Sequence, residues 1–259
     1  MVAVFSVKGG SGATTIATNL AGSLLGRETG TPRSAVLCDL DFQMGDVLAF
    51  LDVVSRYSWK DLVQNFYRLD HDLLLQSLTV HPSGLRVLSQ TDRPEDGDDI
   101  EVDVLMDAVT LLRRHFDFVI VDGLRDFRET SLAILDAADT VLVVATQDVP
   151  ALKNANRSLS ILKRLGYDRG TVRLVLNRYS KEGVDRGAVA DALGVEVSAV
   201  VSNDFPTVVR AINEGKLLDD LAPKARVTRD IAGLVSLVQG APAEAQPETR
   251  GLFARWRKA

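Results

Sequence analysis

Short apolar runs alternate with segments of helical periodicity along most of the chain. Because several runs carry β-branched residues on both faces, they predict buried parallel strands. The runs are VAVFSV, SAVLCDL, LRVLSQ, FDFVIVD, TVLVVAT, TVRLVLN and VSAVVSN. Between them apolar residues recur at helical spacing, as in the sets Ile16, Leu20, Leu24 and Leu105, Val109, Leu112, Phe116. This alternation predicts an α/β three-layer sandwich with a mostly parallel central sheet, whose ligands bind beyond the carboxyl ends of the strands.

The periodic pattern stops near residue 238. The stretch 239–250, QGAPAEAQPETR, is rich in Ala, Pro, Gln and Glu and has no periodicity, which predicts a flexible linker. We therefore expect one globular domain over residues 1–238 and a basic amphipathic tail over residues 251–259.

Composition and charge narrow the class of protein. A net charge of −5 argues against a chain that coats nucleic acid over its whole surface. The single cysteine, Cys38, excludes an intrachain disulfide and suits a reducing cytoplasm. The histidines are scattered without the spacing of metal ligands, and no apolar run has the length of a membrane span. We therefore expect a cytoplasmic protein.

The first predicted strand leads through a glycine-rich loop into a helix. Loop and helix start comprise Gly9, Gly10, Ser11, Gly12, Ala13, Thr14 and Thr15. The glycines let backbone amides approach an anion closely, and the positive end of the helix points to the same place. Either threonine can offer a hydroxyl to Mg²⁺, and Lys8 is the nearest cation. A glycine-rich turn that binds no ligand is the alternative.

Acidic residues end two of the predicted strands. Asp39 and Asp41 close the second strand, and Asp122 closes FDFVIVD. Beside a phosphate loop, such acids hold Mg²⁺ or its waters. The rival interpretation is a dinucleotide site in which Asp39 or Asp41 binds a ribose, but Thr15 stands where that motif needs its third glycine. Loop, threonines and acids together favour an Mg²⁺–nucleotide site.

Asn177 and Arg178 end the strand TVRLVLN, where an amide can read the edge of a purine. A guanine-binding motif of the type N-K-x-D would place an aspartate where this chain has Ser180. Adenine is therefore the expected base, and a simple strand-to-loop exit is the alternative.

With these features, the sequence resembles the ParA/MinD family of deviant phosphate-loop ATPases, whose loop reads K-G-G-x-G-K-T-T where this chain has KGGSGATT. It is most similar to the TadZ/CpaE subgroup of pilus-assembly localisation proteins, over nearly residues 1–236. The similar segments are KGGSGATTIATNLA, DLDFQMGDV, SGLRVLSQ, LAILDAADTVLVVATQDVPALKNA, LNRYS, NDFPTVVRAINEG and APKARVTRDIAGL. The resemblance implies a P-loop NTPase fold, bound ATP and Mg²⁺, and an ATP-dependent homodimer.

The resemblance also implies roles for individual residues. Lys8 would reach across a nucleotide-sandwich dimer to the partner's phosphates. Thr14 would bind Mg²⁺, and Thr15 would contact the α-phosphate side. Asp41 would lie near the attacking water and the metal, and Asp122 would hold the metal through water. The residues implied at the adenine are Asn177, Arg178 and, in the loop 203–206, Pro206.

The sequence departs from the family pattern in two places. Ala13 replaces a lysine whose charge can contribute several kcal/mol to stabilising a transferring phosphate. We therefore expect nucleotide binding with turnover below about one per second, where kinases reach about 1–100 per second. The segment VDGLRDF, which contains Asp122, also lacks the proline common in the second switch region of the family.

In the tail, Leu252, Phe253 and Trp256 fall on one helical face, with basic residues around the other. The tail resembles the membrane-targeting tip of MinD-type proteins. Insertion of one tail and its attraction to anionic lipid would give a few kcal/mol, so firm attachment would need the two tails of a dimer. A disordered tail, or one that docks on its own domain, is the alternative.

We expect a localisation switch: an ATP-dependent dimer at the membrane or cell pole that places pilus or secretion machinery. One alternative is a DNA-partitioning ATPase. Its candidate basic patches are Arg210 with Lys216, and Lys224 with Arg226 and Arg229. Another is a scaffold that has lost nucleotide binding, with Ala13 as a step in that direction. The iron–sulfur reductases that share this loop need a set of cysteines that Cys38 alone does not supply.

Overall fold

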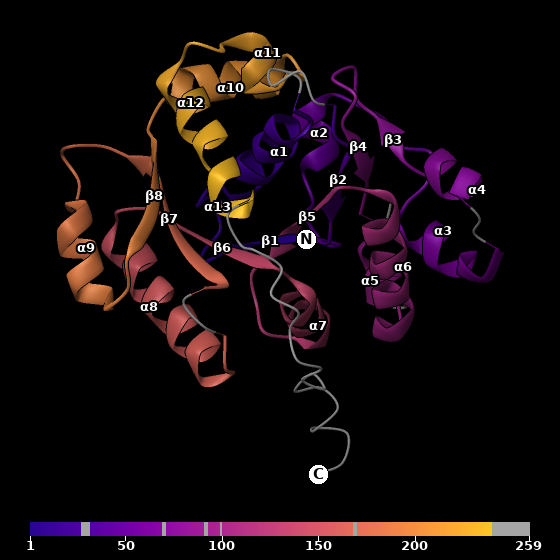
Figure 1. The fold of residues 1–259 in the computed structure, drawn as a ribbon, viewed down its shortest axis with the longest axis horizontal. Helices are drawn as coiled ribbons and strands as arrows, with labels where there is room; N and C mark the ends of the chain where they lie inside the picture. The colour runs from indigo at the N-terminus through magenta and orange to yellow at the C-terminus, as the bar shows by residue number, and fades with distance from the viewer. Residues whose placement is uncertain (27–31, 69–70, 91–92, 99, 168–169, 240–259) are drawn as a thin grey trace.

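A mostly parallel sheet forms the centre of the computed structural model, which describes all residues except 27–31, 69–70, 91–92, 99, 168–169 and 240–259 (Figure 1). Its eight strands run in the order β3-β4-β2-β5-β1-β6-β7-β8. They are β1 (Val2–Ser6), β2 (Ala35–Asp39), β3 (Thr79–Val80), β4 (Arg86–Leu88), β5 (Phe118–Leu124), β6 (Thr140–Ala145), β7 (Val172–Tyr179) and β8 (Val197–Ser202). All neighbouring strands are parallel except β3 and β4. The predicted sheet is confirmed.

The central strand β1 shows why the strand sequences are apolar on both faces. Val2 and Val4 pack into one hydrophobic core, and Ala3 and Phe5 pack into the other. All four side chains are at most 1% exposed. Because helices cover both faces of the sheet, successive residues of a strand are buried alternately above and below it.

Helices cover the two faces and complete the predicted three layers. They are α1 (Ala13–Leu24), α2 (Val47–Leu51), α3 (Trp59–Gln64), α4 (His71–Gln76), α5 (Pro94–Asp98), α6 (Val102–His115), α7 (Glu129–Ala137), α8 (Val149–Arg164), α9 (Arg186–Leu193), α10 (Phe205–Asn213), α11 (Leu218–Leu221), α12 (Arg226–Gly233) and α13 (Val235–Gln239), with a 3₁₀ turn at Phe66–Arg68. In Figure 1, α1 and α10 to α13 lie above the sheet, and α7 and α8 lie below it. Both predicted helical patterns are confirmed, by α1 and by α6.

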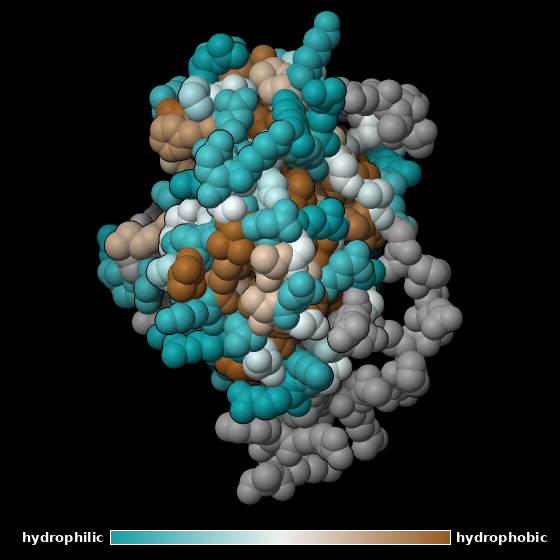
Figure 2. Space-filling view, turned by 90° about the vertical axis from the view of Figure 1, so that its left-hand side faces the viewer, coloured by the Kyte–Doolittle hydropathy of each residue, from teal (hydrophilic) through white to brown (hydrophobic). Residues whose placement is uncertain are grey.

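Seen from the side of β8 and α9, hydrophobic residues gather in the middle of the molecular surface, between hydrophilic ones (Figure 2). The strand β8 is an edge strand, in which Val197 and Val201 are buried and the other four side chains are half-buried. The helix α9 packs beside it, so only part of the edge is left to solvent.

The sequence did not predict β3, an antiparallel edge strand of two residues. The described part of the chain ends at Gln239, the last residue of α13. The remainder of the predicted linker, and the tail with Leu252, Phe253 and Trp256, lie outside the described residues. The proposed domain boundaries therefore stay predictions.

Candidate functional site

The glycine-rich loop connects β1 to α1 at the carboxyl edge of the sheet. Gly10 and Gly12 have φ angles of +78° and +84°, a left-handed conformation that glycine adopts without steric cost. Gly12 caps α1, and within the described chain no side chain bonds to the first amides of this helix. Because these amides have no partner inside the helix, they are free to bind an anion.

Asn177, at the end of β7, holds this loop in place. Its side chain is 6% exposed, and Nδ2 donates a hydrogen bond of 2.8 Å to the carbonyl oxygen of Ser11. A Cβ atom on Gly12 would lie 2.2 Å from Nδ2 of Asn177, so residue 12 must be glycine for the loop and β7 to approach this closely. The residue predicted to read a purine thus also fixes the phosphate loop.

Asp39 orders the loop that follows β2. It is fully buried, and its carboxylate accepts hydrogen bonds from the amides of Asp41 at 3.0 Å and Val47 at 3.4 Å. Burial, with the negative charge of Asp122 beside it, raises the pKa of Asp39 to about 7. A Cβ on Gly45 would lie 2.4 Å from Oδ2 of Asp39. The carboxylate of Asp39 is surrounded by backbone and does not face a ribose. Asp39 therefore does not fit the ribose-binding role that the rival dinucleotide interpretation gave it.

Asp122 lies beside Asp39 in the register of β2 and β5. It is 2% exposed, and burial raises its pKa to about 6 although the hydroxyl of Thr14 donates to its carboxylate. Its Oδ1 atom is buried and has no hydrogen-bond partner among the described residues. Such an oxygen, beside a threonine hydroxyl at the start of α1, fits a metal-bound water.

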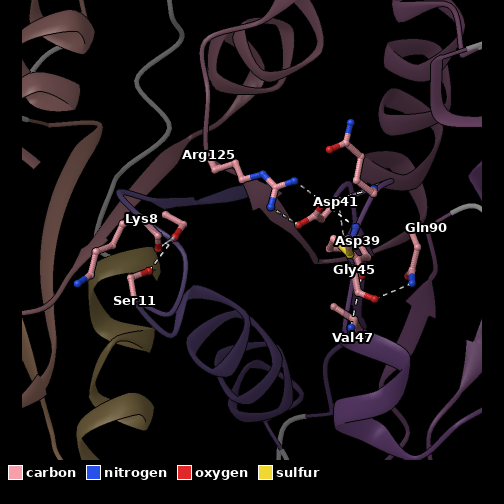
Figure 3. Close-up of polar contacts among 11 residues, drawn as sticks. Lys8, Ser11, Asp39, Asp41, Gly45, Val47, Gln90 and Arg125 are labelled. Carbon is pink, nitrogen blue, oxygen red and sulfur yellow. Dashed lines mark hydrogen bonds and ion pairs between the residues drawn. The ribbon is translucent and has the colours of Figure 1, made fainter. Parts of the chain in front are cut away.

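Asp41 forms an ion pair with Arg125, which follows β5 (Figure 3). The guanidinium nitrogens lie 2.9 Å from Oδ2 and 3.0 Å from Oδ1 of Asp41, a bidentate arrangement. The amides of Gln43 and Met44 also donate to Oδ1, at 3.3 and 3.1 Å. The Asp41 carboxylate therefore orders its own loop while it is paired with Arg125.

These elements surround a cleft of about 370 Å³. Most residues predicted for the site line it: Gly9, Gly10, Ser11, Gly12, Ala13, Thr14, Thr15, Asp41, Asp122, Asn177 and Arg178. The structure thus brings together loop, threonines and acids that are up to 169 positions apart in the sequence. Lys8 and Pro206 are not among the residues that line this cleft.

Lys8 points away from Asp41 toward the outside of the loop (Figure 3). Its Nζ atom lies 2.9 and 3.0 Å from the two carboxylate oxygens of Asp148, which caps α8. The Thr146 hydroxyl and the Ala151 amide also donate to this carboxylate. Burial alone would raise the pKa of Asp148, but these donors together lower it to about 2. The sequence analysis missed Asp148; its position before V-P-A indicates only a helix cap.

The far part of the cleft is apolar. Phe205, Val208, Val209 and Ile212 of α10 line it, with Val227 and Ile231 of α12. Phe205, which is 60% exposed, lines the cleft, whereas its neighbour Pro206 does not, and the predicted role of Pro206 at the adenine stays a prediction. Arg178 also lines the cleft, with a φ angle of +51°, which is uncommon for a residue other than glycine. An apolar wall beside an amide and a guanidinium is suited to a flat heterocycle.

The candidate basic patches of the DNA-partitioning alternative are partly neutralised. Arg210 and Lys216 pair with Glu214, and Arg226 pairs with Asp230. Pairing with acids weakens the attraction of these cations to phosphate.

Cys38 is buried within β2, where burial raises the pKa of its thiol.

Two features of the described residues bear on metals and membranes. No group of three or more His, Cys, Asp or Glu side chains in this part of the chain is arranged to hold a metal ion. No helix built from these residues is long and apolar enough to cross a membrane.

A parallel sheet whose first strand ends in a phosphate loop, with acids closing neighbouring strands, defines a P-loop nucleotide-binding protein. A family model described as an AAA domain matches residues 1–168. The chain is 24% identical to the septum site-determining protein MinD of Thermotoga maritima over 250 residues, which are 93% of this chain and 88% of that protein. Because the family model covers more than half of the chain, it shows the family, and together with the MinD relative it identifies the chain as a ParA/MinD-family ATPase.

Solved structures of this family have the same fold. A ParA family ATPase from Chlorobium tepidum superposes with a TM-score of 0.83 at 21% identity, over 90% of this chain and 98% of that chain. The septum site-determining protein MinD from Pyrococcus horikoshii, complexed with Mg-ADP, has a TM-score of 0.75 at 20% identity, over 92% and 96%. The predicted fold class and family are thus confirmed, and the TadZ/CpaE subgroup stays a prediction.

Proposed function

We propose that this chain is an ATP-dependent dimerisation switch of the TadZ/CpaE type, which localises pilus or secretion machinery at a membrane site or cell pole. One observation carries the proposal: the phosphate loop and two strand-end acids share one cleft, while Lys8, the loop's own cation, lies outside it. A lysine directed away from its own cleft would be available to the phosphates of a second copy of the chain, which supports the proposal.

The residues of the cleft fit Mg²⁺–ATP. The Thr14 hydroxyl and the unpaired Oδ1 of Asp122 would hold Mg²⁺ and its waters, which supply charge neutralisation to the phosphates when bound. The amides of the loop would bind the phosphates. The apolar wall with Phe205, beside Asn177 and Arg178, would hold adenine.

Slow hydrolysis follows from the charges. Ala13 stands where a loop lysine would stabilise the transferring phosphate, so the loop itself contributes no cation there. We therefore propose that pairing of two copies, and not rapid turnover, is the output of the site.

Membrane attachment is the further part of this function. A dimer would carry two copies of the tail with Leu252, Phe253 and Trp256, which together act as a bivalent anchor on anionic lipid. Nucleotide-dependent pairing would then become nucleotide-dependent attachment, and the attached dimer would recruit the pilus or secretion proteins.

The experiment is a titration of the full chain with Mg²⁺–ATP, followed by turnover of radiolabelled ATP with and without Lys8→Ala. We expect measurable binding and turnover below about one per second. Imaging of a fluorescent fusion then tests localisation, which Lys8→Ala is expected to abolish. Absence of binding, or brisk hydrolysis that Lys8→Ala leaves unchanged, would overturn the proposed function.

A further inference from the structure

More acidic than basic side chains line the cleft. Among the described residues, the cations that line it are Arg125 and Arg178. The acids that line it are Asp41, Asp46, Asp122 and Asp204. A triphosphate adds further negative charge to an already acidic cleft, and the loop provides Ala13 where a lysine would offset it. Besides Mg²⁺ and the partner's Lys8, tight binding of a triphosphate therefore calls for a cation from another element of the same chain.

Arg125 comes from the correct side of the cleft. It follows Asp122 by three residues, so its backbone starts at the strand end that carries the acid predicted to hold the metal. Between them, Gly123 has a φ angle of +93°, and a Cβ there would lie 2.3 Å from the amide nitrogen of Asp41. The arginine segment and the Asp41 loop are therefore packed backbone against backbone, at the acidic end of the cleft.

The guanidinium of Arg125 is held by charge and not by burial. Its side chain is 46% exposed, whereas that of Asp41 is 16% exposed. A half-exposed ion pair of this kind is weak, because water screens it and a long side chain must be ordered to form it. A phosphate with more than one negative charge competes well with a single carboxylate for such an arginine.

Exchange of this partner would also release Asp41. Oδ1 of Asp41 accepts from three donors, namely Arg125 and the amides of Gln43 and Met44, and Oδ2 accepts from Arg125. The lone pairs needed to orient a water are thus largely occupied while the arginine is paired. Movement of Arg125 to the phosphate would free the Asp41 carboxylate when the triphosphate is bound, which is when Asp41 would orient a water.

We propose that Arg125 is the phosphate-binding cation that this site uses in place of the loop lysine, exchanging Asp41 for the terminal phosphate of the nucleotide. The inference rests on the proposed function, because it takes a nucleoside triphosphate as the ligand. It makes Arg125 specific for the triphosphate, since a diphosphate lacks the group that Arg125 binds.

The test is calorimetric titration of the full chain with a non-hydrolysable ATP analogue and with ADP, both with Mg²⁺. In Arg125→Gln, affinity for the analogue is expected to fall about 10- to 100-fold, and affinity for ADP less than about threefold. Arg125→Lys keeps the charge without the bidentate fork, so its affinity for the analogue lies between. Retained ADP binding also shows that the variants are folded.

The matched control is Arg128→Gln. Arg128 belongs to the same segment, is 80% exposed, pairs with Asp126 at 3.5 Å and does not line this cleft. Its loss is expected to leave both affinities unchanged. Restoring a loop lysine provides the complementary arm: Ala13→Lys in the Arg125→Gln background is expected to recover affinity for the analogue.

Each outcome decides the question. Selective loss for the triphosphate, recovered by Ala13→Lys, supports the inference. If Arg125→Gln binds both nucleotides as tightly as the wild type, the ion pair with Asp41 is only a structural contact, and the inference is overturned. Equal loss for both nucleotides also overturns it, because Arg125 would then not distinguish the terminal phosphate. A wild-type chain that binds neither nucleotide overturns the proposed function itself, and this inference with it.

Discussion

The contact between Lys8 and Asp148 leads to a prediction about dimer strength. If Lys8 serves the partner's phosphates, it must first leave Asp148, whose oxygens lie 2.9 and 3.0 Å away. Asp148→Asn removes the charge that retains Lys8. It keeps the cap of α8, because asparagine caps helices as well as aspartate does. We therefore expect the variant to dimerise more strongly than the wild type.

The magnitude follows from exposure. The two side chains are 32% and 43% exposed, so the ion pair contributes about 0.2–1 kcal/mol per subunit. A dimer breaks two such pairs, which gives about 0.4–2 kcal/mol, or a dimer dissociation constant lower by about 2- to 30-fold. Because salt screens half-exposed charges, the difference should shrink as ionic strength rises.

Sedimentation equilibrium with the ATP analogue and Mg²⁺ measures this constant at low and high salt. Asp185→Asn is the control, since Asp185 caps α9 through the amide of Gly187 in the same way. Equal dissociation constants for Asp148→Asn and the wild type at low salt, or the same shift in the control, would refute the reasoning.

Three further predictions follow. Gly12→Ala places a Cβ 2.2 Å from Nδ2 of Asn177 at a φ of +84°, so it should destabilise the fold by about 2–4 kcal/mol and abolish nucleotide binding. Chemical denaturation and titration measure both. Burial raises the pKa of Asp39 from 3.8 to about 7, so ionisation costs the folded wild type stability as pH rises through this window. Between about pH 5 and about pH 8, the free energy of unfolding of Asp39→Asn should fall by about 1–4 kcal/mol less than that of the wild type. Parallel profiles of unfolding free energy against pH for the two proteins would contradict this. A chain cut after residue 239 should fail to float with anionic vesicles in the presence of ATP, whereas the full chain floats.

Most of the fold could be predicted from sequence because the central strands are buried on both faces. A continuous apolar run such as FDFVIVD, which became β5, is hard to mistake in a chain whose helices have clear periodicity. The exception, β3, has two residues and one half-buried side chain, too few to produce a period. It forms by pairing with β4, a tertiary contact that the local sequence pattern does not reveal.

The site was predictable where chemistry is local and unpredictable where it depends on distant pairs. The phosphate loop is a continuous segment with a known pattern, and Asp122 ends a strand. Lys8 and Asp148 meet across 140 positions, and Asp41 and Arg125 across 84. The sequence showed an unusual segment after Asp122, but only the folded backbone reveals that its arginine reaches Asp41.

The central claim is that Lys8 completes the site of a second subunit. The most direct measurement is the solution mass of the wild type and of Lys8→Ala with the ATP analogue and Mg²⁺, at micromolar protein. The account predicts a wild-type dimer, and a variant that binds the analogue as a monomer. A wild type that stays monomeric with the analogue bound, or a variant that dimerises equally well, would contradict it.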